Sequence, residues 1–399
     1  MAKILCNYFG LSMAAEGKSE FVGRQAAAFL GYVQQDAERC AENCGCAEDL
    51  SDAPEDLSDA PEEIKREILR NDEELRRREQ TAPGVEHDVV AIYDNAGIPS
   101  IMHRFRRVTN KELFGGSDAV HPAFIIGGEV YDEIYISVYE NTMINGKPYS
   151  LPLQEPVTNI TMEDFAQACF SKGEGWHCLT AAEWGLLADT SLKLGTLPHG
   201  NTNCSHWHGD DKEQGIIIED SYKTLTGSGP ATWTHDHTAS GVHDLCGNIW
   251  EVARGVRIRD GALWAAENND AALPETDLTE CGDGWKPITD AEGHPLYVAV
   301  EDNKITFNTY PSIHRDYCGC AWGDVRMNCD SEQLRALALF AGEEKAGCYV
   351  DSTEGEYILV RGGGWSSGGG AGVFRSYLYD PRSNAYGYLG GRSAYFKKH

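Results

Sequence analysis

Short runs of alternating apolar and polar residues dominate the chain, and this pattern predicts many strands and few helices. Residues 123–126 and 130–139, joined by a Gly-Gly turn, are expected to be strands. Helical spacing of apolar residues predicts helices starting at Thr161 and Thr180, the second ending at Gly195, and a third helix over residues 331–341. Loops rich in glycine and asparagine fill much of the rest, so the pattern favours an α+β fold.

Each expected helix has one apolar stripe that should face the core. The stripes are Phe165, Ala168 and Cys169 in the first helix; Trp184, Leu187, Ala188 and Leu194 in the second; and Leu334, Leu337, Ala338 and Ala341 in the third.

Residues 1–85 differ in character from the rest of the chain. A direct repeat, Asp-Leu-Ser-Asp-Ala-Pro-Glu, occupies residues 49–55 and 56–62, and its prolines and acids are typical of a spacer. A charged helix is expected to follow over residues 62–80, with two heptads at most. We therefore expect a helical and linker region at 1–85, which could join sister copies or attach to a virion, and a ligand-binding domain at 86–399.

Composition narrows the classes of partner and compartment. The formal net charge is −28, so no net cationic field attracts nucleic acid. No apolar stretch approaches the length of a membrane span, and the start of the chain does not resemble a signal peptide. The thirteen cysteines are irregularly spaced and contain no CxxC pair, which favours free thiols in a reducing compartment. We expect a virion or cytoplasmic protein without membrane insertion.

The closing segment, residues 361–396, has an unusual mixture of residues. Five tyrosines alternate with arginine, serine, asparagine and aspartate after a glycine-rich stretch. This mixture is typical of an antibody paratope, in which tyrosine and arginine supply contact area and small polar residues supply adaptable hydrogen bonds. The side chains of Arg375, Tyr377 and Tyr379 should share one face of an extended strand. The alternative is an ordinary terminal hairpin region whose tyrosines pack against the domain.

Several spaced motifs resemble one known family. Residues 241–252 contain Gly-Asn-Ile-Trp-Glu, residues 361–365 read Arg-Gly-Gly-Gly-Trp, and residues 390–394 read Gly-Gly-Arg-Ser-Ala. With residues 173–184 and 121–124, they resemble the formylglycine-generating-enzyme type of C-type lectin fold over residues 95–399. Within that fold, the closing segment most resembles the variable proteins of diversity-generating retroelements, which are phage or prophage target-binding proteins.

This resemblance implies a lectin-type fold with short twisted antiparallel strands, two or three helices and long loops. It implies a scaffold of Arg361, Trp365, Arg392, Asn248 and Trp250, with Trp250 and Trp184 in the core. The diversified, ligand-binding positions would be Ser366, Ser367, Gly370, Arg375, Tyr377, Tyr379, Asp380, Ser383, Asn384, Tyr386, Tyr388 and Gly391, with a weaker correspondence at Gly369 and Arg382. Gly364 and Gly391 depart from the residues that are commoner in the family.

The same fold also includes metal-dependent oxidases, which provide the alternative function. The formylglycine-generating chemistry needs a cysteine near the C-terminal motif, but the last cysteine here is Cys348. The histidines at 199, 206, 208, 235, 237 and 243 are the richest source of metal ligands, although their spacing matches no helical site. Glu251 and Asp244 near Asn248 could hold calcium, but a hydrogen-bonding role for Asn248 is favoured. We therefore expect a non-enzymatic protein, without a required cofactor, that recognises a protein or glycan on a target surface.

Overall fold

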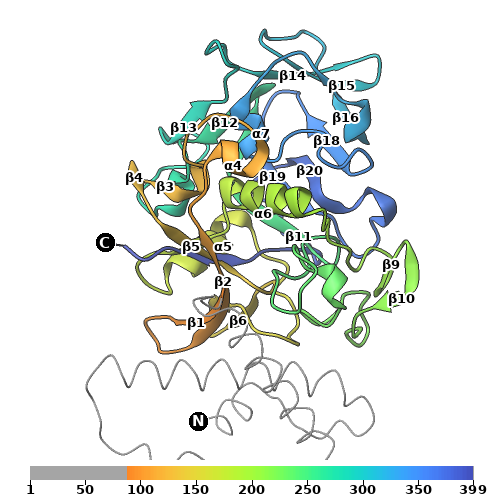
Figure 1. Ribbon diagram of the computed structural model, residues 1–399. Coiled ribbons are helices and arrows are strands. Elements are labelled where there is room, and N and C mark those ends of the chain that lie inside the picture. The colour runs from red at the N-terminus through yellow and green to blue at the C-terminus, as the bar shows by residue number, and fades with distance from the viewer. Residues whose placement is uncertain (1–87, 399) are drawn as a thin grey trace, which may run out of the picture. The chain divides into compact units, whose positions relative to one another are not determined.

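A computed structural model of the chain describes residues 88–398 (Figure 1). The chain divides into two compact units between Ala91 and Ile92, and the architecture below belongs to the second, apart from the first residues of strand β1. The predicted assembly region at 1–85 lies outside the described residues. Within the described range, no helix has both the length and the apolar composition needed to cross a bilayer.

A five-stranded sheet joins the beginning and end of the second unit. Its order is β1-β2-β5-β22-β8, so the C-terminal strand lies between strands from much earlier in the chain. Both neighbours of β22 run antiparallel to it. The five strands are β1 (Val89–Tyr93), β2 (Pro99–Arg106), β5 (Glu133–Ser137), β8 (Trp176–Cys178) and β22 (Ser393–Tyr395).

A larger sheet of eleven strands carries the closing segment. Its main path is β16-β18-β20-β19-β11-β12-β14-β15-β17, with β13 paired to β12 and β21 paired to β11. The strands are β11 (Trp250–Arg259), β12 (Ala262–Ala266), β13 (Trp285–Pro287), β14 (Tyr297–Glu301), β15 (Lys304–Asn308), β16 (Tyr317–Ala321), β17 (Arg326–Met327), β18 (Gly347–Asp351), β19 (Glu356–Gly362), β20 (Gly372–Asp380) and β21 (Leu389–Gly390).

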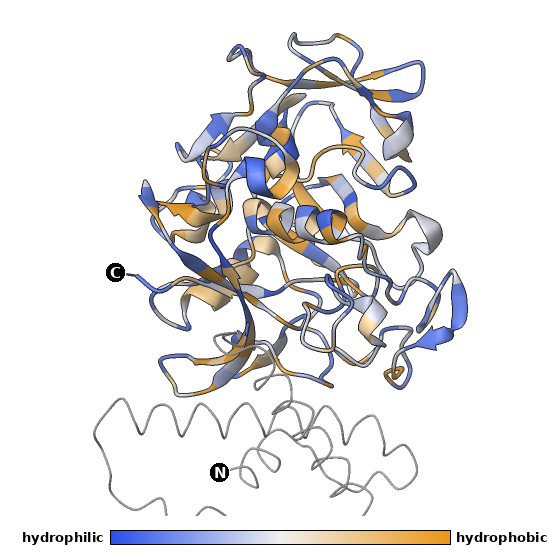
Figure 2. Ribbon diagram, in the orientation of Figure 1, coloured by the Kyte–Doolittle hydropathy of each residue, from blue (hydrophilic) through white to orange (hydrophobic). Residues whose placement is uncertain are grey.

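Three two-stranded hairpins complete the sheet structure: β3 (Ile125–Ile126) with β4 (Glu129–Val130), β6 (Thr142–Ile144) with β7 (Lys147–Tyr149), and β9 (His206–Trp207) with β10 (Asp210–Gln214). The β9–β10 hairpin is strongly hydrophilic (Figure 2). The expected strand at 123–126 is thus shorter than predicted, because residues 122–124 form a 3₁₀ turn capped by the buried His121 side chain. The expected strand at 130–139 is divided between β4 and β5.

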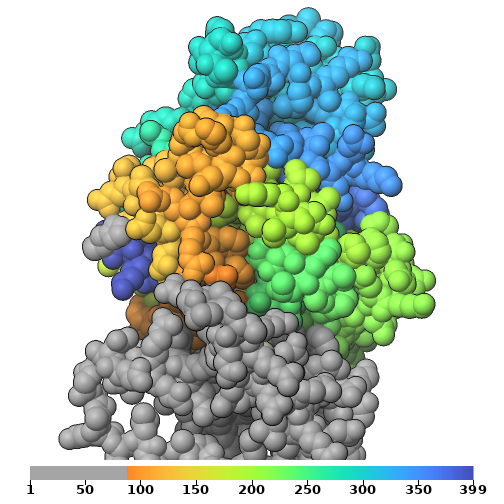
Figure 3. Space-filling view, viewed as in Figure 1, coloured from red at the N-terminus to blue at the C-terminus, as the bar shows by residue number. Residues whose placement is uncertain are grey.

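Four α-helices lie within residues 88–398: α4 (Asn110–Phe114), α5 (Met162–Phe170), α6 (Ala181–Leu194) and α7 (Glu332–Ala336). The predicted start and end of α6 are confirmed. Thr180 and Glu183 form a capping box, and Gly195 ends the helix in the left-handed region at φ 72°. Helices α4 and α6 contact each other and are visible on the viewed face in Figure 3.

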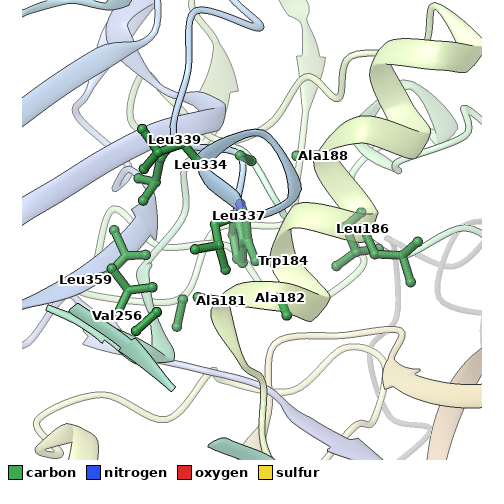
Figure 4. Packing of buried hydrophobic residues seen from close by; sticks show 14 of the residues in the cluster. Ala181, Ala182, Trp184, Leu186, Ala188, Val256, Leu334, Leu337, Leu339 and Leu359 are labelled. Carbon is green, nitrogen blue, oxygen red and sulfur yellow. The ribbon is translucent and has the colours of Figure 1, made fainter. Parts of the chain in front are cut away.

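Helix α6 carries much of the main hydrophobic core. Trp184 and Leu187 are fully buried, and residues of α6 pack near Leu334 and Leu337 (Figure 4). The Trp184 indole donates to the Val373 carbonyl oxygen at 2.7 Å, which fixes the helix against β20. Leu194, expected in the buried stripe, is instead 56% exposed because it lies in the last turn of the helix.

The third predicted helix is much shorter than expected. Helix α7 spans only Glu332–Ala336, and Ala338 has a left-handed φ of 51°. The buried Arg361 guanidinium donates to the Leu337 and Ala338 carbonyl oxygens, which a continuing helix would need for its own hydrogen bonds. A long-range contact therefore ends this helix, and Ala341 is exposed.

Candidate functional site

Strand β20 has one face in the core and one face lined by the residues predicted to bind ligand. It pairs antiparallel with β19 and parallel with β18, so it is central in its sheet. Phe374 and Leu378 are buried in the main hydrophobic cluster. Tyr377 and Tyr379 lie on the opposite face, as the alternation of residues predicted.

Aromatic side chains from four other strands of the sheet meet these two tyrosines. We call this set the aromatic face: Trp250 on β11, Tyr317 on β16, Tyr349 on β18, Tyr357 on β19, and Tyr377 and Tyr379 on β20. The Tyr377 ring centroid lies 5.1 Å from that of Trp250 and 5.5 Å from that of Tyr349. The Tyr379 ring centroid lies 4.6 Å from that of Tyr317 and 5.5 Å from that of Tyr377. The rings therefore form a connected layer across the sheet.

Exposure differs across the aromatic face. Tyr317 and Tyr379 are 48% and 36% exposed, whereas Tyr349, Tyr357 and Tyr377 are half-buried. Burial raises the pKa of the Tyr377 phenol, so it stays neutral and able to donate a hydrogen bond at physiological pH. A surface of fixed, partly exposed rings with polar tips suits contact with another macromolecule.

Trp250 departs from the core position expected for it. It is half-buried on the aromatic face, whereas Trp184 is fully buried as expected. The difference arises because Trp250 begins β11 next to β21, where its backbone N–H donates to the Tyr388 carbonyl oxygen. Tyr317, Tyr349 and Tyr357 were missed by the sequence analysis because they lie before the closing segment. Only their strand pairing with β20 or its neighbours brings them to this face.

The turn after β20 adds a second aromatic pair. The Tyr386 and Tyr388 rings stack with centroids 5.0 Å apart and are 37% and 42% exposed. Tyr386 lies in irregular backbone and Tyr388 in a turn, so neither is part of a strand. Two side-chain contacts stabilise this segment: Asn384 donates to the buried Asp380 carboxylate, and Arg382 forms an ion pair with Glu356.

The glycine-rich stretch before β20 forms a loop attached to an earlier segment. Ser366 is exposed, Ser367 and Gly370 are half-buried, and the half-buried Trp365 ring lies 4.8 Å from that of Tyr222. The Trp365 carbonyl oxygen accepts from the backbone N–H of Cys204, and the Gly368 N–H donates to the Thr202 carbonyl oxygen. These backbone bonds attach the loop to the earlier segment, and within the loop the Ser367 hydroxyl accepts from the Gly364 N–H at 3.0 Å.

The predicted binding positions therefore divide by exposure. Ser366, Tyr379, Ser383, Tyr386 and Tyr388 are exposed; Ser367, Gly370, Tyr377 and Asn384 are half-buried; Arg375, Asp380 and Gly391 are buried. Of the two less clear positions, Gly369 is exposed and Arg382 is half-buried. A Cβ atom at Gly391 would lie 3.0 Å from both Phe165 and Val252 side chains, so this position belongs to the packed interior. Its role in binding remains a prediction.

Two buried arginines of the closing segment, Arg361 and Arg392, connect it to the rest of the unit. Arg361 bonds to the Leu337 and Ala338 carbonyl oxygens and to Ser376, and burial lowers its pKa to about 9. Arg392 forms a two-point ion pair with Glu251, in which both groups are almost fully buried. These contacts join the closing segment to β11 and to the residues after α7.

The Glu251 pair lies in a buried acidic cluster. The pKa of Glu140 is raised well above its ordinary value, mainly by burial and further by Asp244 and Glu251. Burial also raises the pKa of Asp244 to about 6. Asn248 donates to Glu140 at 2.6 Å, and its own oxygen accepts from Asn201 and Thr224. The contacts of Asn248 therefore fit the hydrogen-bonding role that was favoured over a calcium site. Its side-chain oxygen already accepts from N–H donors.

One group of potential metal ligands lies elsewhere in the unit. Ligand atoms of His103, His235 and Asp236 lie within 4.8 Å of one another. However, the Val242 backbone N–H donates to His235 Nδ1 at 2.9 Å, so in the neutral ring the proton is on Nε2. Burial lowers the pKa of His235 to about 3, which keeps the ring neutral. Metal binding at His235 would thus require breaking a backbone hydrogen bond.

Two of the other histidines considered in the sequence, His199 and His208, have local polar partners. The His199 ring stacks on Trp207 with centroids 3.6 Å apart, and its Nδ1 lies 2.9 Å from the Glu213 carboxylate. His208 Nδ1 lies 3.0 Å from the Thr202 hydroxyl. Within the described part of the chain, the groups with metal-ligand spacing are the His103 group and an exposed loop group of Asp290, Glu292 and His294.

Comparisons with known proteins give weak similarities only. No family model matches the sequence, and no curated protein matches it. Among solved structures, the chain is similar to PvdO from Pseudomonas aeruginosa, with 13% identity, a TM-score of 0.32, and coverage of 78% of this chain and 99% of that one. It is also similar to the Major Tropism Determinant P3c variant, with 11% identity, a TM-score of 0.29, and coverage of 79% and 73%. Similarities of this size carry no argument about function. The architecture itself is mostly sheet with few helices and long loops, which is compatible with the lectin-type fold expected from the motifs.

Proposed function

We propose that this chain is a binding protein that recognises a macromolecular partner through the aromatic face and the adjoining turn with Tyr386 and Tyr388. One observation carries the proposal. Tyrosines from several strands lie on one side of the eleven-stranded sheet and remain partly exposed, although the opposite side of β20 packs in the hydrophobic core. Exposed aromatic layers of this kind are costly in water and normally mark interaction surfaces.

The finer proposal is that the chain is the variable protein of a diversity-generating retroelement, with a C-type lectin fold. Its motif arrangement supports this, because Arg361 and Arg392, which belong to the scaffold in the resemblance, are buried and bonded. Exposed candidate positions such as Ser366, Ser383 and Tyr388 lie in loops and turns, where substitution disturbs packing least. Display on a virion, through residues 1–85, would let several weak contacts act together.

The proposal assigns no bond-making chemistry to the chain. The segment after Cys348 lacks the thiol that formylglycine-generating chemistry needs. The metal-dependent oxidase is the second candidate, favoured by the grouping of His103, His235 and Asp236. Metal analysis of the purified full chain separates the two. Stoichiometric iron or copper that is lost in His235→Gln would support the oxidase.

Selection from a displayed library of random peptides tests the binding proposal directly. The full chain is immobilised, and peptides are enriched over several rounds. We expect a convergent family of peptides, because a preformed layer of rings offers the same contacts to every library member. Sequences that fail to converge, or that bind equally well to the heat-denatured chain, would count against a recognition surface.

A further inference from the structure

Arg375 is a buried cation at the centre of the binding surface. Its guanidinium lies over the Trp250 ring at 4.7 Å and over the Tyr349 ring at 4.9 Å. The residue is only 7% exposed. Contact with two ring faces stabilises the cation and limits the directions in which its N–H groups can donate.

The other deeply buried arginines donate to carboxylates or backbone carbonyl oxygens, whereas the acceptor for Arg375 is the Tyr349 phenol. Arg392 pairs with Glu251, Arg257 pairs with Glu356, and Arg361 donates to backbone carbonyl oxygens. Within residues 88–398, no carboxylate lies within ion-pair distance of Arg375, and its buried Nε has no hydrogen-bond partner, a feature that it shares with Arg257 and Arg361.

The neighbours of Arg375 are neutral. Burial is the main cause that lowers its pKa, and the Tyr349 phenol, which accepts a hydrogen bond from it, and the Cys246 thiol oppose this effect. Burial keeps the pKa of Cys246 well above its ordinary value, so that thiol carries no charge at neutral pH. Burying a cation without an anion costs free energy, and a partner that supplies the anion recovers it.

A glycine turn lies beside the guanidinium. The turn spans Gly368–Gly370, and a Cβ atom at Gly370 would lie only 2.8 Å from Arg375 Nη1. Gly369 is exposed and Gly370 half-buried, so this turn places no side chain between Arg375 and an approaching partner. The guanidinium is therefore flanked by aromatic rings and by glycine backbone that carries no side chain.

We propose that Arg375 receives the carboxylate of an aspartate or glutamate side chain on a protein partner, an inference that rests on the proposed binding function. The planar guanidinium edge matches a carboxylate in two-point geometry. The surrounding phenols are typical of surfaces that contact proteins. The chain has a net charge of −28, so it repels acidic partners at long range. The Arg375 contact therefore acts after docking and slows dissociation.

Nuclear magnetic resonance of full-length protein labelled with ¹⁵N-arginine tests this assignment. The Arg375 Nε–Hε signal is identified by its loss in Arg375→Lys, and blocked Gly-Glu-Gly and Gly-Gln-Gly peptides are titrated at constant ionic strength. We expect a saturable shift with the glutamate peptide and none with the glutamine peptide. Equal shifts with both peptides, or no shift with either, would overturn the proposal, as would a saturable shift with glucuronate alone.

A second variant leaves Arg375 in place, so the test does not depend on whether substituting Arg375 affects folding. Gly370→Leu retains Arg375 but covers its edge, and we expect it to abolish the shift. Gly128→Leu, at an exposed glycine of positive φ between β3 and β4, should not abolish it. With a library-selected peptide, Arg375→Met should weaken binding about 10- to 100-fold, mainly through faster dissociation. If the selected peptides contain no acidic residue and Arg375→Met does not change their affinity, this inference is wrong but the proposed binding function is not affected. Failure to select any peptide would contradict both this inference and the proposed binding function.

Discussion

Replacing Tyr379, Tyr386 and Tyr388 together with alanine is expected to weaken binding of a library-selected peptide by at least about 100-fold. Exposed tyrosines at the centre of an interface commonly contribute more than 1 kcal/mol each, and every 1.4 kcal/mol is a tenfold change in affinity. The three side chains are 36%, 37% and 42% exposed, so the free energy of unfolding should fall by less than about 2 kcal/mol. Equilibrium binding and denaturant unfolding measure the two effects.

A matched variant removes three exposed apolar side chains away from the aromatic face. Val130, Leu194 and Tyr310 are 41%, 56% and 56% exposed, and they become alanine together. This variant should bind the peptide as the unmodified chain does. If both triple variants lose affinity equally, nonspecific hydrophobic contact explains the binding and the aromatic face is not the site.

Replacing Arg392 with methionine is expected to lower the free energy of unfolding by about 3–5 kcal/mol. The change removes the cation that pairs with buried Glu251 and leaves that carboxylate beside Glu140 and Asp244. Denaturant unfolding at neutral pH measures the loss. The loss should shrink as the pH is lowered, because protonated carboxyl groups no longer need a counter-charge.

A double variant identifies the cause of that loss. Adding Glu251→Gln to Arg392→Met removes the uncompensated carboxylate, so part of the lost stability should return. A cost below about 1 kcal/mol for Arg392→Met, or no recovery in the double variant, would show that the ion pair does not hold the closing segment in place.

Local signals in the sequence predicted the elements that depend on local contacts. The capping box of Thr180 and Glu183 and the left-handed Gly195 are visible in the sequence, and they define helix α6. The alternation of Arg375, Tyr377 and Tyr379 correctly predicted one shared face of β20. These features depend on residues a few positions apart, so they can be predicted without knowledge of the tertiary structure.

Long-range contacts were not visible in the sequence. Helix α7 ends early because Arg361, on the distant strand β19, donates to the carbonyl oxygens of Leu337 and Ala338 just after the helix. Tyr317, Tyr349 and Tyr357 join the site only through sheet pairing. Arg375 was expected among the ligand-binding positions, but it is buried beside two aromatic rings and a glycine turn. Strand order decides these positions, and no periodicity in the sequence specifies strand order.

Population sequencing of codons 361–396 most directly tests the claim that a substitutable surface is carried by a fixed framework. We predict that substitutions cluster at exposed positions of the closing segment, above all Ser366, Tyr379, Ser383, Tyr386 and Tyr388, while Arg361 and Arg392 remain unchanged. Substitutions spread evenly along the segment, or concentrated at the two buried arginines, would contradict the account.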